Sequence, residues 1–172
     1  IGVLEFNRGQ IFYDSVEINQ LSLDWLRSNL TYLPQEPKFI DGTLLDNLIG
    51  VTEIKKDKMD EILKSVNLID FVNSDPNGIK KPFLNRGEDL PIGIRKRIAL
   101  ARSLVISGQI VVLDEPTESM DESGRSAIYN LITKMIKDKK TLIVCTHDKK
   151  IIDSAKFILD LDQRPISVKN NN

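Results

Sequence analysis

The stretch that decides the fold is Gln109–Asp121, with the sequence QIVVLDEPTESMD. It begins with a short unbroken apolar run, Ile110–Leu113, which is typical of a strand buried on both faces. The run ends in two carboxylates, Asp114 and Glu115, and Pro116 then stops the strand. Because two unpaired carboxylates at the mouth of a buried strand would be costly, we expect a cation or a polarised water to face them.

The carboxylate pair has two interpretations. In the first, a hydrated Mg²⁺ on a nucleotide phosphate faces the pair, so that Asp114 holds the metal shell and Glu115 orients and deprotonates the attacking water. In the second, the strand simply ends at a polar turn and Asp114 caps the next helix. The motif alone does not choose between them, and the rest of the chain decides.

Composition and charge limit the classes of protein. With 172 residues and 41% hydrophobic content, the chain is about one domain with enough apolar content for a core. The 24 basic side chains balance 25 acidic ones, which excludes a global basic field for nucleic acid. A single cysteine excludes an internal disulfide framework. No apolar run approaches the length of a membrane span, so a membrane part would have to lie elsewhere.

The first part of the chain predicts short strands and one short helix. We expect strand-like pieces at Gly9–Asp14 and Val16–Ile18, and a helix over Ser22–Asn29. Leu30–Pro34 returns to strand character and leads into Gln35. A glutamine after a strand is usually a loop residue, so Gln35 alone indicates little.

A mostly helical lobe is expected from Val51 to about Asp89. Before it, Thr43 is placed to cap a helix, with Asp46 three residues on as an imperfect capping box. Within the lobe, apolar residues recur at helical spacing over Lys55–Val66.

A basic helix follows the lobe. Pro91 suits its first turn, where a missing N–H is harmless. Arg95, Lys96 and Arg97 cluster in its first half, either as a solvated basic patch or with a role in a site, and the sequence leaves both open.

The last part of the chain predicts a helix at Glu122–Lys137 and another buried strand at Thr141–Cys145. That strand ends at His147, the only histidine of the chain. A lone histidine is more often structural, but parallel sheets place ligand-contacting groups at such strand ends. We further expect a strand at Phe157–Leu161 and a tail from Gln163 onward.

Taken together and in this order, the motifs resemble the ATP-binding domain of ABC transporters. The resemblance implies an α/β, P-loop NTPase-like core, with a mainly parallel sheet flanked by helices, an inserted small helical lobe and missing N-terminal strands. The matching motifs are Gln35 as the Q-loop, LPIGIRKRIALARSL (90–104) as the signature helix, IVVLDEP (110–116) as the Walker B strand, SMD (119–121) as the D-loop and CTHD (145–148) as the H-loop.

The resemblance also implies a division of the chain and a place in the cell. The features around Gln35 and before Leu90 look closest to exporters, with bacterial type I protein secretion and peptide export as the first expectation. A membrane domain in the same polypeptide and a position at the cytoplasmic face of the inner or plasma membrane follow. We expect an N-terminal core remnant (1–50), a helical subdomain with the signature helix (51–107), a core with Walker B, D-loop and H-loop (108–162) and a tail (163–172).

In this family two such domains pair head to tail with Mg²⁺ and ATP between them. By this resemblance Asp114 would serve Mg²⁺ through water and Glu115 would be the general base. Gln35 would sense the metal and the attacking water, and His147 would bridge the γ-phosphate and the partner's D-loop around Ser119 and Asp121. The signature residues, which would aim a helix N-terminus at the partner's ATP, are Leu90, Pro91, Ile92 and Gly93.

Two departures from the family pattern matter. No G-x-x-x-x-G-K-[ST] phosphate loop occurs in the 172 residues, so we expect the chain to start just after that loop. Where the family has Leu-Ser-Gly-Gly-Gln, this chain has LPIGI (90–94). Ile92 adds a bulky side chain and Pro91 cannot donate an N–H, so we expect a weaker contact to ATP.

Three functions therefore stay open at this point. The first is the ATPase domain of an ABC exporter, present here as a fragment. The second is a non-catalytic regulatory or association module, which the missing phosphate loop and altered signature favour and which Glu115 and His147 oppose. The third is a DNA-repair or chromosome-organising ATPase, disfavoured because the interval from Gln35 to Leu90 has room only for a small helical lobe rather than a long coiled coil.

Overall fold

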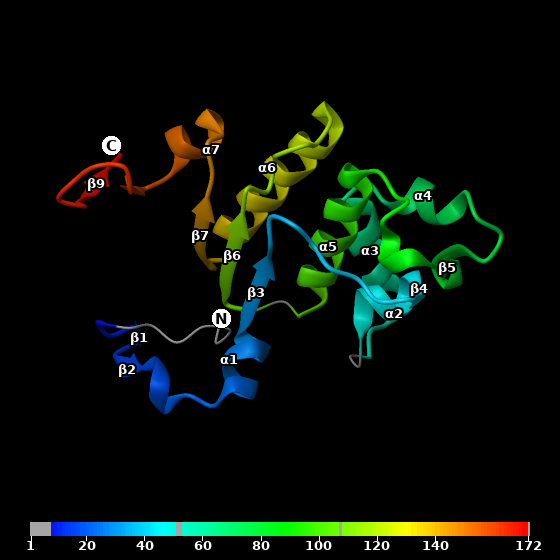
Figure 1. The fold of residues 1–172 in the computed structure, drawn as a ribbon, viewed down its shortest axis with the longest axis horizontal. Helices are drawn as coiled ribbons and strands as arrows, with labels where there is room; N and C mark the ends of the chain where they lie inside the picture. Colours follow the sequence, from blue (N-terminus) through cyan, green and yellow to red (C-terminus); the bar gives the residue numbers. More distant parts are fainter. Residues whose placement is uncertain (1–7, 51–52, 107, 172) are drawn as a thin grey trace.

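The computed structural model describes residues 8–50, 53–106 and 108–171 of the chain. Its centre is a parallel sheet of three strands in the order β3 (Leu30–Leu33), β6 (Ile110–Asp114) and β7 (Thr141–Cys145), as Figure 1 shows. Leu33 pairs with Leu113 on one side of β6, and Asp114 pairs with Cys145 on the other. The carboxyl ends of the strands therefore meet at one edge, as the sequence predicts. The segment at Ile1, where we expect the chain to start just after the phosphate loop, lies outside the described residues.

One face of this sheet carries the core, which corrects two predictions. Val111 and Leu113 of β6 are fully buried, but Ile110 and Val112 on the opposite face are only half-buried. The prediction that β7 is buried is wrong: it is one of the two edge strands of the described sheet, and Ile143 is 53% exposed. The reason is that the core cluster of side chains from α5 and α6 packs against one face of the sheet.

Helix α5 (Ile92–Ile106) joins the sheet to the helical lobe. It contacts β3 on one side and α2 (Leu44–Ile49) and α3 (Lys56–Ser65) on the other, and Figure 1 shows it between these parts. Sheet and lobe share one contiguous apolar core. The division of the chain into separate core and lobe domains stays a prediction.

The lobe and its surroundings consist of short elements. Thr43 and Asp46 form the predicted capping box at the start of α2. The strand β4 (Gly42–Thr43), just before α2, pairs antiparallel with β5 (Pro82–Phe83), and this pairing brings residues 82–83 back beside α2. The other elements here are α4 (Ile69–Asn73) and the 3-10 turns η2 (Gly78–Lys80) and η3 (Asn85–Gly87).

The N-terminal elements agree with the sequence prediction. The strands β1 (Phe12–Tyr13) and β2 (Val16–Glu17) form an antiparallel pair. After the 3-10 turn η1 (Ile18–Gln20), Ser22 caps helix α1 (Leu23–Asn29), which leads directly into β3.

The C-terminal elements include one surprise. Helix α6 (Glu122–Lys137) has the predicted bounds, and helix α7 (Lys149–Ser154) follows β7. β8 (Phe157–Leu159) pairs antiparallel with β9 (Val168–Asn170), which lies in the segment predicted as a tail. Across the parts of the chain that the structure describes, no helix is long and apolar enough to cross a bilayer.

Candidate functional site

A cleft of about 890 Å³ lies beside the carboxyl ends of β6 and β7. Its walls come from the loop after β3, the turn after β6, the first turns of α6 and the loop after β7, and they are mostly polar. Of the predicted site residues it gathers four: Gln35, Glu115, Ser119 and His147.

Glu115 and His147 are in direct contact across the ends of β6 and β7. Glu115 Oε1 lies 2.6 Å from His147 Nδ1. The carboxylate is sheltered, with 18% of the side chain exposed, whereas the imidazole is 97% exposed and projects into solvent. A sheltered carboxylate next to an imidazole can accept a proton from a water and can hold the ring in one orientation.

The backbone fixes where Glu115 points. Its N–H donates to the Cys145 carbonyl at 2.9 Å, which continues the pairing of β6 with β7 by one residue. Its φ is +42°, a left-handed conformation that is strained for a residue with a side chain. Strain of this kind concentrates at functional turns, and here it turns the carboxylate toward the cleft.

Gln35 is tied to the turn after β6 through Glu118. Gln35 Nε2 donates to Glu118 Oε2 at 3.1 Å, and the buried Lys96 contacts the same oxygen at 3.4 Å. The hydrogen bond from Gln35, followed by the positive charge of Lys96, lowers the pKa of Glu118. The loop after β3 and the turn after β6 are therefore held together on one carboxylate.

Asp114 is half-buried at the end of β6, opposite Cys145 of β7. Burial, followed by the negative charge of Asp114, raises the pKa of Tyr32 on the neighbouring strand. The interpretation of Asp114 as a helix cap is wrong, because α6 begins eight residues later and is capped by Asp121.

The start of α5 lies near the turn after β6. A Cβ placed on Gly93 would lie 3.7 Å from the Ser119 carbonyl, an ordinary contact distance. Pro91 lies one residue before α5 rather than within its first turn: its carbonyl accepts the N–H groups of Ile94 and Arg95 at 3.0 and 3.1 Å, as the carbonyl of an N-cap residue does. Leu90, Ile92 and Gly93 are half-buried, so they are only partly available to a ligand.

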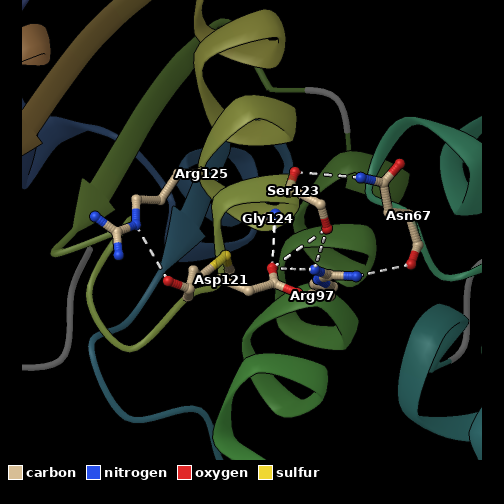
Figure 2. Close-up of polar contacts among 7 residues, drawn as sticks. Asn67, Arg97, Asp121, Ser123, Gly124 and Arg125 are labelled. Carbon is tan, nitrogen blue, oxygen red and sulfur yellow. Dashed lines mark hydrogen bonds and ion pairs between the residues drawn. The ribbon is translucent and has the colours of Figure 1, made fainter.

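Asp121 anchors a network that joins α5, α6 and the helical lobe (Figure 2). Its carboxylate accepts the Gly124 N–H at 2.7 Å and pairs with Arg97. Arg97 also donates to Ser123 Oγ at 3.0 Å and to the Asn67 carbonyl at 3.1 Å. The bond from the Gly124 N–H, more than the Arg97 guanidinium, lowers the pKa of Asp121. The Asp121 carboxylate is therefore held in place by contacts within its own chain.

The interpretation of the basic cluster as a solvated patch is wrong. Lys96 is buried and Arg97 and Arg95 are half-buried. Lys96 reaches the Glu115 carbonyl and Glu118 in the turn after β6, and Arg97 pairs with Asp121 at the start of α6.

Sequence reasoning missed four residues in or beside the cleft. Lys96 and Glu118 were missed as a pair because 22 positions separate them. Tyr129 was counted as part of an amphipathic helix, yet its hydroxyl donates to Asp148 Oδ2 at 2.7 Å. Asp148 in turn caps α7 and so fixes the loop that carries His147. A signal for Asp148 was present, since aspartate before a helix is a common cap.

Comparisons with known proteins match this arrangement. The model of the family described as ABC transporter matches residues 1–118. The multidrug resistance-like ATP-binding protein MdlB of Buchnera aphidicola is 31% identical over 96% of this chain and 28% of its own length. The ATP-dependent lipid A-core flippase of Bordetella avium is 31% identical over 90% of this chain and 26% of its own length.

A solved structure gives the same result at the level of the fold. The structure of a bacterial Atm1-family ABC exporter with ATP bound superposes with a TM-score of 0.86 at 25% identity, over 95% of this chain and 29% of that one. The chain thus spans less than a third of the length of each of these relatives. The chain belongs to the ABC transporter family, and it is an ATP-binding domain of the exporter type.

Proposed function

We propose that this domain hydrolyses ATP, held with Mg²⁺ between two such domains paired head to tail, and so powers export across a membrane. Glu115 is the general base that takes a proton from the attacking water. His147 orients Glu115 from one side and presents its exposed ring to the γ-phosphate and to the partner's D-loop around Ser119 and Asp121. Gln35 senses the metal and the attacking water and relays this to the membrane domain.

The single observation that carries the proposal is the 2.6 Å contact between Glu115 Oε1 and His147 Nδ1 at the mouth of the cleft. A base and an orienting group within hydrogen-bond reach are what proton abstraction from water requires. The strained backbone of Glu115 supports the same assignment, because strain of this kind persists where surrounding contacts enforce it.

The oxygen donors near the strand ends suit Mg²⁺. Asp114 supplies a half-buried carboxylate and Gln35 a side-chain amide oxygen, and both are hard ligands of the type Mg²⁺ takes. No group of three or more acidic, histidine or cysteine side chains able to hold a metal occurs in the described ranges. This fits an ion that takes one or two protein ligands and fills its shell with water and phosphate. When bound, it would neutralise charge that develops on the phosphates.

The signature segment contacts ATP in trans in this proposal. The 15-residue helix α5 has an N-terminus that suits an anion. Leu90 and Pro91 precede it, and Ile92 and Gly93 are its first two residues. Pro91 offers no N–H and Ile92 is bulky, so this contact is weaker than one made by Leu-Ser-Gly-Gly-Gln.

The partners follow from the same proposal. They are a second nucleotide-binding domain, identical or distinct, and a membrane domain, in the same polypeptide, that places this domain at the cytoplasmic face of the inner or plasma membrane. The prediction of protein or peptide secretion stays a prediction. The relatives reported above carry names for multidrug resistance and lipid A-core flipping instead.

A second candidate is a non-catalytic association module. It is favoured by the LPIGI sequence at 90–94 and by the absence of a G-x-x-x-x-G-K-[ST] motif from the 172 residues. We therefore expect the 172-residue chain by itself to bind Mg-ATP weakly and not to turn it over. Micromolar affinity measured by calorimetry on this chain would contradict that expectation.

The test of the proposal is ATP turnover by the full-length protein that contains this domain, with Glu115→Gln. Removing a general base lowers turnover by about 10²–10⁴-fold. The matched control is Glu61→Gln, which removes an exposed carboxylate on α3 far from the strand ends. Equal turnover in both variants would reject the assignment of Glu115 as the base, and no turnover by the unmodified protein would favour the association module.

A further inference from the structure

The ammonium group of Lys96 is buried next to the site. Its side chain is 3% exposed, and Nζ lies 3.1 Å from the Glu115 carbonyl and 3.4 Å from Glu118 Oε2. Taking a lysine charge out of water is costly unless it is paired and hydrogen-bonded. The surroundings of Lys96 therefore point to a specific task for this charge, because an apolar residue would fill the same space at lower cost.

Both contacts of Lys96 lead to groups that the proposed reaction uses. The carbonyl that it binds belongs to Glu115, the residue with the left-handed backbone. The carboxylate that it binds is the one that accepts the hydrogen bond of Gln35 at 3.1 Å. One ammonium group thus touches the turn that carries the base and, through Glu118, the glutamine on the neighbouring loop.

The exposure of the partners shows why the ammonium is needed. Glu118 is 49% exposed, so in the absence of Lys96 its carboxylate is free to turn into water. The Glu115 carbonyl also accepts the Glu118 N–H at 3.3 Å. Lys96 is the buried cation that both groups share.

We propose that Lys96 is a positioning residue for the ATPase site: it holds the Glu115 backbone and the Glu118 carboxylate, and through Glu118 it holds Gln35. The inference rests on the proposed function, because Glu115 and Gln35 matter together only in ATP hydrolysis. Lys96 touches neither water nor phosphate in this assignment. Its effect on the reaction is indirect and acts through geometry.

The experiment is NMR of the isotopically labelled 172-residue chain, with Lys96→Met as the variant. Methionine keeps an unbranched apolar stem of the same length and removes the ammonium group. We expect the titration midpoint of the Glu118 carboxyl to rise, because the carboxylate loses its cation, and the Gln35 side-chain amide resonances to move toward those of a free glutamine. We also expect the Glu115 amide resonance to shift or broaden.

The matched control is Lys58→Met. Lys58 Nζ also pairs with a glutamate, Glu61 Oε2, at 3.1 Å, but this pair is exposed on α3. The control should leave the resonances of Gln35, Glu115 and Glu118 in place. If Lys96→Met folds and these resonances also stay in place, Lys96 has only a packing role and the inference is wrong.

A second variant keeps the test decisive if Lys96→Met does not fold. Glu118→Ala removes an exposed side chain, so the fold should tolerate it. We expect it to release the Gln35 amide and to change the ¹⁵Nζ resonance of Lys96, and unchanged resonances would overturn the inference. Neither readout needs nucleotide, so loss of the proposed function and loss of this inference are separate results.

Discussion

Two regions meet at the turn after β6 and are held there by different means. The carboxyl ends of β6 and β7 line the cleft, and the start of α5 packs against that turn. At the strand ends, sheet register places Asp114, the left-handed turn directs Glu115, and the Asp148 cap fixes the loop of His147. The sequence there follows the family pattern. At the start of α5, the family pattern is altered, and the helix is anchored by two basic side chains, Lys96 and Arg97, that reach carboxylates in the following turn. Backbone geometry therefore positions the side chains at the strand ends, whereas ion pairs between side chains anchor the start of α5.

The largest effect should come from the core beneath the strand ends. Leu113→Ala removes a fully buried side chain, and we expect the free energy of unfolding to fall by about 2–5 kcal/mol. Ile143→Ala on the edge strand is the matched control, because that side chain is 53% exposed and its loss should cost under about 1 kcal/mol. Chemical denaturation measures both. Similar losses would mean that both faces of the sheet are equally buried, contrary to the structure.

An intermediate effect on stability is expected from alanine substitutions of two glycines, Gly93 at the start of α5 and Gly108 just after its end, and the two changes should have opposite signs. A Cβ on Gly108 would lie 2.3 Å from the Asn29 carbonyl oxygen, so Gly108→Ala should destabilise by about 1–3 kcal/mol. A Cβ on Gly93 meets only an ordinary contact, so Gly93→Ala should stabilise by about 0.4–1 kcal/mol. Thermal unfolding of the two variants checks the contrast. A loss of stability in Gly93→Ala would show that the start of α5 is packed more tightly than described here.

The smallest effect should come from the cap that joins α5 to α6. Asp121→Ala removes the cap on the Gly124 N–H and the partner of Arg97, and we expect a loss of about 0.5–2 kcal/mol. The pKa of Asp121 is lowered in the folded protein, so its contribution is present above its unfolded pKa and is lost as the pH falls through the folded value. Denaturation of wild type and variant at neutral and acidic pH tests this. A difference that does not shrink in acid would contradict it.

Much of the fold and of the candidate site could be predicted from the sequence. Apolar runs ending in polar residues indicated β6 and β7 and brought Asp114, Glu115 and His147 to one edge, because parallel register is set by the strands themselves. The capping signal at Thr43 predicted the start of α2 for a local reason, and the helix expected over Ser22–Asn29 forms with Ser22 as its cap.

The rest depends on contacts between distant residues. The hydrophobic pattern gives no sign that Lys96 is buried, since a basic run on a helix usually faces water, and only the fold shows Glu118 next to it. The exposed face of β7 was not predicted for a similar reason, because an apolar run does not indicate whether its strand lies at the edge of a sheet. The pairing of β8 with β9 was not predicted because β9 is only three residues long and lies in the segment that we expected to be a tail.

The most direct test of the central claim is ATP turnover by the full-length protein with Glu115→Gln, with His147→Ala and with both changes. If the two side chains act as one unit, as their 2.6 Å contact indicates, the double variant should be no slower than the slower single variant. If instead the two losses multiply, Glu115 and His147 act independently, and the account of a base oriented by its neighbouring histidine is wrong.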